Sequence, residues 1–344
     1  MEIGEELDLR LRIFDRLAQE LAAKGSLTRD ELTEFPVDGT SYRLIDRNRG
    51  IWNPRGFAAT LSILSKPDSQ YQDDAVGESL FGYAYRAGSM RGDNTKLRRA
   101  VELKLPVILL RWIADGIYVP IAPVYVVADD MPNQRVILAM DETLREVADP
   151  LHLQPLERAY ATRITRQRLH QPEFRARILQ AYQHRCGVCN LGHPQLLDAA
   201  HIIADTAFHG LASTENGLCL CKLHHAAYDT NLLGISPTFE IRIAPKLMRD
   251  RTTGPTLQHA LQGVNGTMLV LPKRRVDHPA PKRLAERFME FEKANGVGQV
   301  DISWPTSTAV VPAIGATSPN THNEAGGRVT EYSQPARVST TGGR

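Results

Sequence analysis

The feature that most constrains this chain is the concentration of its cysteines. All four lie between Cys186 and Cys221, in a sequence of 344 residues. Disulfide frameworks are typical of small secreted chains, whereas a local thiol cluster in a long chain indicates a metal site in a reducing compartment. The sequence therefore predicts a metal-stabilised unit in this region and a cytoplasmic protein.

The spacing of these residues indicates which side chains would hold the metal. Cys186-x-x-Cys189 supplies one pair of ligands, and Cys221-x-x-His224 supplies a second. Two such pairs complete the tetrahedron that a structural Zn²⁺ prefers and can hold a small domain together. Cys219 is a rival for the fourth position, since it shares a strand face with Cys221 if this segment is extended. Four unliganded thiols are the remaining alternative.

Length and composition limit what the rest of the chain can be. With 42% hydrophobic residues, a chain of this length can bury two cores of ordinary size. Its 41 basic and 39 acidic residues give a net charge of +2, which neither requires nor excludes a nucleic-acid partner. The first residues lack the basic region of a signal peptide, and no apolar run is long enough to span a bilayer. We therefore expect no membrane association.

Hydrophobic periodicity predicts an α+β fold. Helical patterns cover residues 5–23, 26–35, 94–103 and 282–291, and strand patterns cover residues 59–64, 80–85, 106–112 and 124–127. The apolar stripe of the first helix is expected to consist of Leu7, Leu11, Phe14, Leu17 and Leu21.

These patterns divide the chain into five parts. We expect an N-terminal helical segment at 1–40, a β-barrel domain at 41–147, a basic linker at 148–170, a second domain at 171–296 and a tail at 297–344. The tail is rich in Thr, Ser, Pro, Gly and Asn, a composition that cannot offset the entropy of ordering, so we expect it to be disordered.

The segment before the cysteine cluster is basic. Residues 156–185 contain seven arginines and two glutamates. Such a segment can lie along DNA phosphates, with Arg175 and Arg177 as the expected contacts, although a solvated helix face is the alternative. Residues 273–275 and 282–283 form a second basic cluster, which serves either phosphate contact or solubility.

A histidine, an asparagine and a second histidine stand at defined points of the cysteine-rich region. His201 follows Ala-Ala at the end of a predicted strand at 196–203, and Asn216 opens the sequence Asn-Gly-Leu-Cys-Leu-Cys-Lys-Leu-His-His. His225 ends that sequence, and Asp229 lies four residues later. On a helix these last two side chains face the same way and can bind one divalent cation. The imidazole of His201 titrates near neutral pH and suits a general base.

This arrangement resembles the HNH, or ββα-metal, nuclease family over roughly 60 residues. The resemblance implies that His201 takes a proton from water and that Asn216 fixes the loop and the orientation of His201. It also implies that His225 and Asp229 bind Mg²⁺ or Mn²⁺, which stabilises the pentacovalent phosphate and the leaving 3′ oxygen. Ala200 departs from the family, in which many members carry a metal-binding Asp or His at this position. Asp198 is a candidate substitute, two residues earlier on the strand.

The β-rich part has its own unusual run. Tyr71-Gln-Asp73-Asp74 is followed by a strand with Tyr83 and Tyr85, and then by Gly92-Asp93-Asn94. Together these residues resemble the SRA (SET- and RING-associated) domain, whose pocket holds a flipped modified cytosine. The alternative is a PUA-like β-barrel that binds something else or is structural.

The SRA resemblance assigns roles to these side chains. A flipped base needs aromatic faces and partners for its Watson–Crick edge. Tyr71 with either Tyr83 or Tyr85 would supply the faces, and Asp74 would accept a hydrogen bond from the cytosine amino group. Asp93 and Asn94 would lie on the DNA-facing side.

With both features together, the chain resembles the SRA-HNH modification-dependent restriction endonucleases. They imply a bacterial defence enzyme that cuts double-stranded DNA carrying 5-methylcytosine or 5-hydroxymethylcytosine. We expect a homodimer, because one ββα site nicks one strand. Two alternatives stay open. One is an HNH nuclease without modification preference. The other is a zinc-containing DNA-binding module that does not cut, which is consistent with the absence of a metal-binding side chain at Ala200.

Overall fold

The computed structural model describes residues 1–66, 75–76, 80–85, 92–207, 209–251 and 254–296. All of them belong to one compact unit, Met1–Gln299. The described chain mixes helices and strands, so the α+β class predicted from periodicity is confirmed. The expected disordered tail lies outside the described residues.

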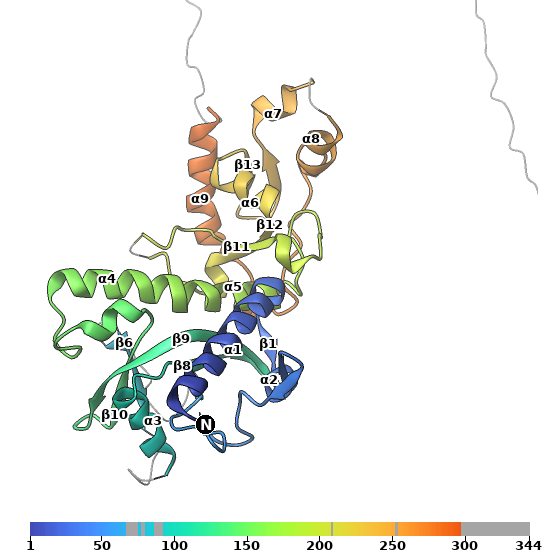
Figure 1. Cartoon of the computed structure of the whole chain (residues 1–344). Coiled ribbons are helices and arrows are strands. Elements are labelled where there is room, and N and C mark those ends of the chain that lie inside the picture. The colour runs from blue at the N-terminus through green and yellow to red at the C-terminus, as the bar shows by residue number, and fades with distance from the viewer. Residues whose placement is uncertain (67–74, 77–79, 86–91, 208, 252–253, 297–344) are drawn as a thin grey trace, which may run out of the picture. The chain divides into compact units, whose positions relative to one another are not determined.

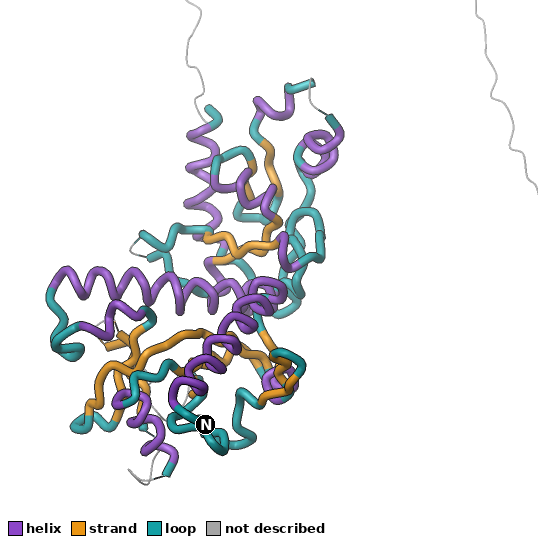
Figure 2. The backbone as a smooth tube through the Cα atoms, viewed as in Figure 1, coloured by secondary structure: helices purple, strands orange, loops and turns teal. Residues whose placement is uncertain are grey.

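A curled sheet dominates the first half of the chain (Figures 1 and 2). Its strands are β1 (Leu27–Thr28), β4 (Ile51–Trp52), β5 (Ser62–Ser65), β6 (Ala75–Val76), β7 (Leu80–Ala84), β8 (Val107–Ala114), β9 (Ile117–Asp130) and β10 (Arg135–Ala139). They follow the order β4-β5-β8-β9-β10-β7-β6, with β1 on β9, and only the β5–β8 pair among the described strands is parallel. The sheet forms half of a barrel, and its identity with an SRA or PUA-like domain stays a proposal.

Shorter elements complete this half. They are helices α1 (Ile3–Lys24), α2 (Arg29–Thr33) and α3 (Asp93–Glu102), the hairpin β2 (Phe35–Val37) and β3 (Thr40–Tyr42), and the 3₁₀ turn η1 (Glu142–Glu146). Helix α3 confirms the helix expected at 94–103, whereas only α2 is helical within 26–35. Strand β9 is longer than the strand expected at 124–127. Pro120 and Pro123 lie inside it, and prolines in a sequence predict a break in a strand.

The buried face of α1 differs from the expected stripe. Leu7 is 36% exposed and Leu11 is 46% exposed, whereas Leu9 and Ile13 are buried with the sheet. The same face also buries Glu6 and Arg10, which form an ion pair of 2.7 Å. The expected stripe was assigned from apolar residues alone, with charged residues placed on the exposed side. Because Glu6 and Arg10 are buried as an ion pair, the buried face of α1 lies next to the expected stripe and not on it.

A continuous helical stretch leads from the sheet to the second half. It consists of α4 (Pro155–Thr165), a π-helical turn η2 (Arg166–His170) and α5 (Gln171–Ala181) (Figure 1). Pro172 has no backbone N–H and cannot make the regular α-helical bond, which accounts for the wider turn just before it. The segment expected as a linker at 148–170 is therefore largely helical.

This helical stretch contributes to two hydrophobic cores. Leu169 and Ala176 pack with the residues of the sheet, whereas Phe174 and Ile178 pack in the core of the second half. Arg111 of β8 also forms an ion pair with Glu173 of α5 at 3.3 Å. Both side chains are buried, and Arg111 additionally donates to Ser65 Oγ at 2.6 Å.

The second half contains small strand pairs and short helices. Its elements are β11 (Leu197–His201), β12 (Gly217–Cys221), α6 (Lys222–Asp229), β13 (Leu233–Ile235), β14 (Ile241–Ile243), α7 (Pro245–Arg249), α8 (Pro255–Ala260) and α9 (Pro281–Ala294), with 3₁₀ turns at Pro194–Leu196, Thr214–Asn216, Gln262–Val264 and Arg275–Asp277. The strand expected at 196–203 and the helices expected after Cys221 and at 282–291 are confirmed.

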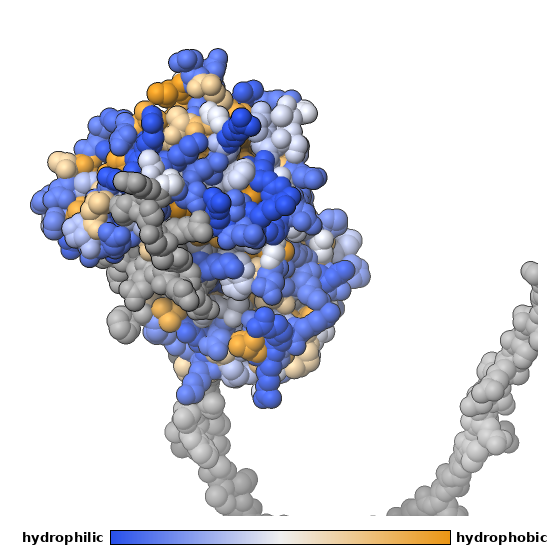
Figure 3. Space-filling view, turned by 90° about the horizontal axis from the view of Figure 1, so that it is seen from below, coloured by the Kyte–Doolittle hydropathy of each residue, from blue (hydrophilic) through white to orange (hydrophobic). Residues whose placement is uncertain are grey.

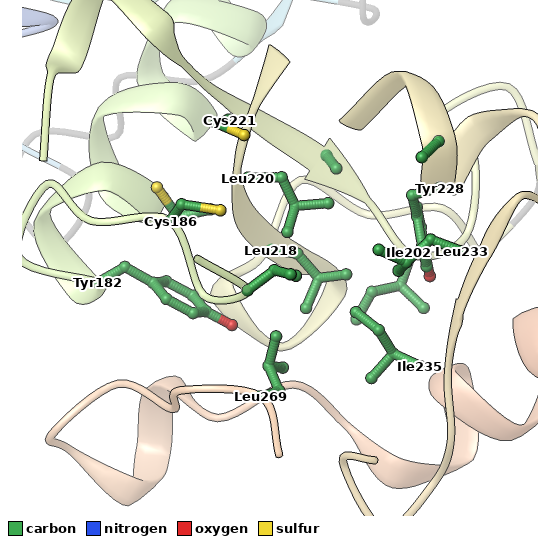
Figure 4. Close-up of a cluster of buried hydrophobic side chains, with 14 of the residues drawn as sticks. Tyr182, Cys186, Ile202, Leu218, Leu220, Cys221, Tyr228, Leu233, Ile235 and Leu269 are labelled. Atoms are coloured by element: carbon green, nitrogen blue, oxygen red, sulfur yellow. The ribbon is translucent and has the colours of Figure 1, made fainter. Parts of the chain in front are cut away.

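The core of this half lies against the cysteine cluster. Figure 4 shows Cys186 and Cys221 at one edge of a group of buried side chains that includes Leu218, Leu220 and Tyr228. On the outside, the face seen in Figure 3 is mainly hydrophilic, with hydrophobic residues scattered over it. None of the described helices is long and apolar enough to cross a membrane.

Candidate active site and metal centre

Three cysteines and one histidine come together as the sequence predicts. The ligand atoms of Cys186, Cys189, Cys221 and His224 all lie within 4.8 Å of one another. Cys189 Sγ is 3.9 Å from Cys221 Sγ, and His224 Nδ1 is 3.1 Å from Cys221 Sγ. A tetrahedral zinc site with metal–sulfur bonds of about 2.3 Å has sulfur–sulfur edges of about 3.8 Å. The cluster therefore has the donors and the size for zinc, and Cys219 is not part of it.

The second nitrogen of His224 supports this arrangement. His224 Nε2 is 2.6 Å from the backbone carbonyl of Ala260, to which it can donate. This hydrogen bond leaves the Nδ1 lone pair directed at the sulfur atoms, as is usual for a metal-binding histidine. A hydrogen bond from Cys221 is the main cause that lowers the pKa of Cys186, which favours a thiolate in this cluster.

The hairpin of β11 and β12, followed by α6, forms a ββα unit. His201 ends β11 and pairs with Gly217, the first residue of β12. Asn216 lies just before β12, is fully buried, and ties the connecting loop together. Its side chain accepts from Ile203 N at 2.9 Å and donates to the carbonyls of Ile203 at 2.9 Å and Leu211 at 3.0 Å. Asn216 therefore holds the loop that follows His201.

The ring of His201 is fixed by stacking. It lies on the ring of Phe174 in α5, with the centroids 4.0 Å apart. Its Nε2 atom is buried and has no hydrogen-bond partner among the described residues. Burial is the main cause that lowers the pKa of His201, and the charge of His225 adds to the effect, while Asp205 and Asp229 oppose it. The imidazole is therefore neutral at pH 7 and able to accept a proton.

His225 and Asp229 lie on one side of α6, one turn apart. His225 Nε2 is 3.3 Å from Asp229 Oδ2, and both side chains are partly exposed. The other ring nitrogen, Nδ1, is 3.4 Å from Asp198 Oδ2. Asp198 thus reaches His225 despite its place two residues before Ala200. The nitrogen and oxygen atoms of His225 and Asp229 fit a divalent cation that keeps further positions for water and phosphate.

The residues expected to contact DNA have protein partners. Arg175 donates to the backbone carbonyls of Pro194 and Leu197 at 2.9 Å, and Arg177 pairs with Glu173. Their contact with phosphate stays a prediction.

The residues expected to form the base pocket are only partly described. Tyr71 and Asp74 lie outside the described residues. Tyr83 and Tyr85 are 5% and 4% exposed and belong to the core of the sheet. Tyr83 donates to the carbonyl of Gly50 at 3.1 Å, and Tyr85 donates to Asp129.

The start of α3 is also tied to the fold. Asp93 forms an ion pair with Arg49 at 3.3 Å and accepts from Asn53 at 3.2 Å. Asn94 is 2% exposed. Their role at a DNA surface stays a prediction.

Nothing in the sequence placed three further residues beside His201, although one of them, Arg166, belongs to the basic segment. A cavity of about 260 Å³ is lined by Arg166 and His170 of the π turn and by Phe174, His201 and Asp205. The register of a π turn departs from the helical period of 3.6 residues, so periodicity could not place Arg166 and His170 on this side. Asp205 lies in a loop whose course depends on Asn216.

The ββα unit with His201 and His225, together with the thiol cluster, has the side chains that metal-dependent hydrolysis of a phosphodiester bond requires. Residues 186–236 match the family model described as HNH endonuclease. They form an HNH endonuclease domain, so the chain is a nuclease that acts on DNA.

Two solved structures are similar to this chain. One is a modification-dependent restriction endonuclease, TagI, with 17% identity over 76% of this chain and 90% of its own, and a TM-score of 0.25. The other is a type IV phosphorothioation-dependent restriction endonuclease, ScoMcrA, with 14% identity over 64% of this chain and 51% of its own, and a TM-score of 0.22. No curated protein matches the chain.

Proposed function

We propose that the chain is a restriction endonuclease that cuts double-stranded DNA carrying 5-methylcytosine or 5-hydroxymethylcytosine. The cutting half of this proposal is carried by one observation: the buried Nε2 atom of His201 has no partner among the described residues and belongs to a side chain that lines a cavity. A buried imidazole nitrogen without a partner is costly unless a ligand or water occupies the site in function.

The side chains around this atom suggest a division of roles. His201 takes the proton from water, Phe174 holds the ring in place, and Asn216 fixes the loop that follows. His225 and Asp229 would hold Mg²⁺ or Mn²⁺, which supplies charge stabilisation at the phosphate and at the leaving oxygen. Asp198 accepts from His225 Nδ1 and leaves Nε2 for the cation.

The thiol cluster would hold a structural Zn²⁺. Its four ligand atoms suit a closed tetrahedral site with no open position for substrate. This zinc would stabilise the hairpin and α6, because Cys221 ends β12 and His224 lies in the first turn of α6.

The recognition half of the proposal is supported by the resemblance of residues 71–94 and by the curled sheet, in which Tyr83 lies on β7 and Tyr85 directly follows this strand. Base flipping would bring the modified cytosine to Tyr71 and Asp74. Because one site cuts one strand, we propose that two copies act together on both strands.

A nuclease without modification preference is the second candidate. The observation that favours it is the burial of both tyrosine rings in the sheet core, with their hydroxyls bonded to Gly50, Leu64 and Asp129. Rings packed in this way offer no free face to a base unless the surrounding side chains move.

Cleavage of matched plasmids separates these candidates. The plasmids would carry cytosine, 5-methylcytosine, 5-hydroxymethylcytosine, its glucosylated form or a phosphorothioate backbone, each with Mg²⁺ or Mn²⁺ and with His201→Ala as control. Cleavage restricted to methyl- and hydroxymethylcytosine supports the proposal. Equal cleavage of all plasmids favours the second candidate, and cleavage restricted to the phosphorothioate plasmid refutes cytosine recognition. Binding of DNA without any cleavage would favour the alternative of a zinc-containing DNA-binding module that does not cut.

A further inference from the structure

The cavity beside His201 is lined by two parts of the chain. Strand β11 and the loop after it contribute His201 and Asp205. The helical stretch contributes Arg166 and His170, which lie before the 186–236 span of the HNH endonuclease domain. Residues from outside this span therefore line the same cavity as His201, the proposed general base.

Arg166 differs from the other arginines of the basic segment. Arg168 donates to the carbonyls of Met140, Ala122 and Pro123, and Arg163 lies over the ring of Tyr160. The remaining ones, Arg158, Arg175, Arg177 and Arg185, donate to backbone carbonyls or to Glu173. Among the arginines of this segment, only Arg166 has a side chain without a hydrogen bond, an ion pair or an aromatic partner among the residues that the structure describes.

The π turn explains why two neighbouring arginines point to different places. The bonds of Arg168 to three carbonyls anchor this turn on the sheet, while Arg166 and His170 line the cavity. Desolvation lowers the pKa of His170, and the charge of Arg166 is among those that lower it further. Arg166 is the lysine or arginine side chain among the residues that line this cavity.

We propose that Arg166, assisted by His170, binds a phosphate of the DNA strand that is cut, in the cavity that His201 also lines. This inference rests on the proposed role of His201 as the base. A guanidinium presents several donors to a phosphate, and it would hold the phosphodiester where a water beside Nε2 can attack it. Asp205, which lines the same cavity, stabilises the imidazolium that forms when His201 takes the proton, since its charge raises the pKa of that ring.

The test combines a binding and a cleavage measurement. Arg166→Ala is compared with Arg166→Lys and with Arg163→Ala, a matched control in the same helix that does not line the cavity. Binding to a short DNA duplex is measured in the non-cutting His201→Ala background at several salt concentrations. Each lost phosphate contact lowers the slope of log affinity against log salt by about one.

We expect Arg166→Ala to lower the salt slope by about one and the single-turnover cleavage rate by about 100-fold. Arg166→Lys should restore the slope but only part of the rate, and Arg163→Ala should change neither. An unchanged salt slope in Arg166→Ala overturns the inference, even if the rate falls, because the arginine would then act through the fold. If the wild-type chain cuts no DNA, the proposed function fails, yet the slope still tests Arg166.

Discussion

Gly217 lets α5 approach the hairpin beside His201 because it has no side chain. A Cβ atom at this residue would lie 2.2 Å from Ile178 Cδ1 and 2.9 Å from Phe174 Cζ. Its φ of −133° is open to any residue, so space and not conformation requires glycine here. The close approach of α5 to the hairpin is what allows Phe174 to stack on His201.

Gly217→Ala should therefore damage both stability and cleavage. We expect a loss of about 1–3 kcal/mol in the free energy of unfolding from overpacking, together with slower cleavage as Phe174 is pushed off His201. Denaturant titration and single-turnover rates measure the two effects. Gly4→Ala, where a Cβ meets nothing within 4 Å, is the control and should leave the rate unchanged.

The pH dependence of cleavage should report the burial of His201. Its pKa lies below the ordinary value of 6.5, so the neutral base persists to lower pH and the rate falls only as pH drops through the lowered pKa. At pH 6.5 and saturating metal, more than half of the plateau rate should remain. Asp205→Asn removes a charge that raises this pKa and should move the acidic limb to still lower pH. A half-maximal rate above pH 6.5 would contradict this reading of the site.

We propose that Asp198 compensates in part for Ala200 by its contact with His225. It contacts His225 Nδ1 and so orients the ring whose Nε2 lies beside Asp229. Loss of such a partner typically weakens metal binding 10- to 100-fold. Calorimetric titration of Mn²⁺ should show a weakening of about tenfold for Asp198→Ala, and titration of Asp229→Ala should show no binding. Equal Mn²⁺ affinity of Asp198→Ala and the wild-type protein would show that Asp198 does not contribute to metal binding.

At the scale of elements, α1 shows how a charged pair can be part of a buried face. Arg10 donates to Glu6 and to the carbonyls of Ala59, Thr60 and Pro106, and Glu6 accepts from Ala58 N at 2.6 Å. The pair thus provides hydrogen-bond partners for backbone groups that lie beneath the helix.

Removal of one partner of this pair should be costly. We expect Arg10→Met to lower the free energy of unfolding by about 3–5 kcal/mol, since it leaves the Glu6 carboxylate buried without its cation. Chemical denaturation measures the loss, and the double variant Glu6→Gln with Arg10→Met should recover part of it. A loss below that of the exposed Arg12→Met would show that the pair contributes nothing.

The elements that the sequence predicts well are those with local signals. The Cys-x-x-Cys and Cys-x-x-His pairs, the strand that ends at His201 and the helix after Cys221 depend on short spacings and are found where expected. Arg166 and Asp205 depend on the π turn and on the course of a loop, which are set by tertiary packing. No spacing in the sequence carries that information.

For the whole molecule, we expect the stability of the second half to depend most strongly on the thiol cluster. Cys186 and Cys221 belong both to the cluster and to the core of the second half, so release of the metal should unfold that core. We expect one zinc per chain by atomic emission and a large fall in melting temperature after chelation. Cys219→Ala should keep the zinc, whereas Cys189→Ser should lose it. Retention of zinc by Cys189→Ser would place the metal elsewhere.

The buried ion pair between Arg111 and Glu173 limits how this enzyme can be re-engineered. Its two members come from strand β8 of the curled sheet and from helix α5, so the pair joins the sheet to the helical stretch that leads into the second half. A chimera that takes only the chain from α5 onward loses Arg111, while Glu173 keeps Arg177 as a charged partner. The buried Arg111 of the first half is then the charge without its carboxylate, so an exchange of halves should supply a carboxylate in the place of Glu173.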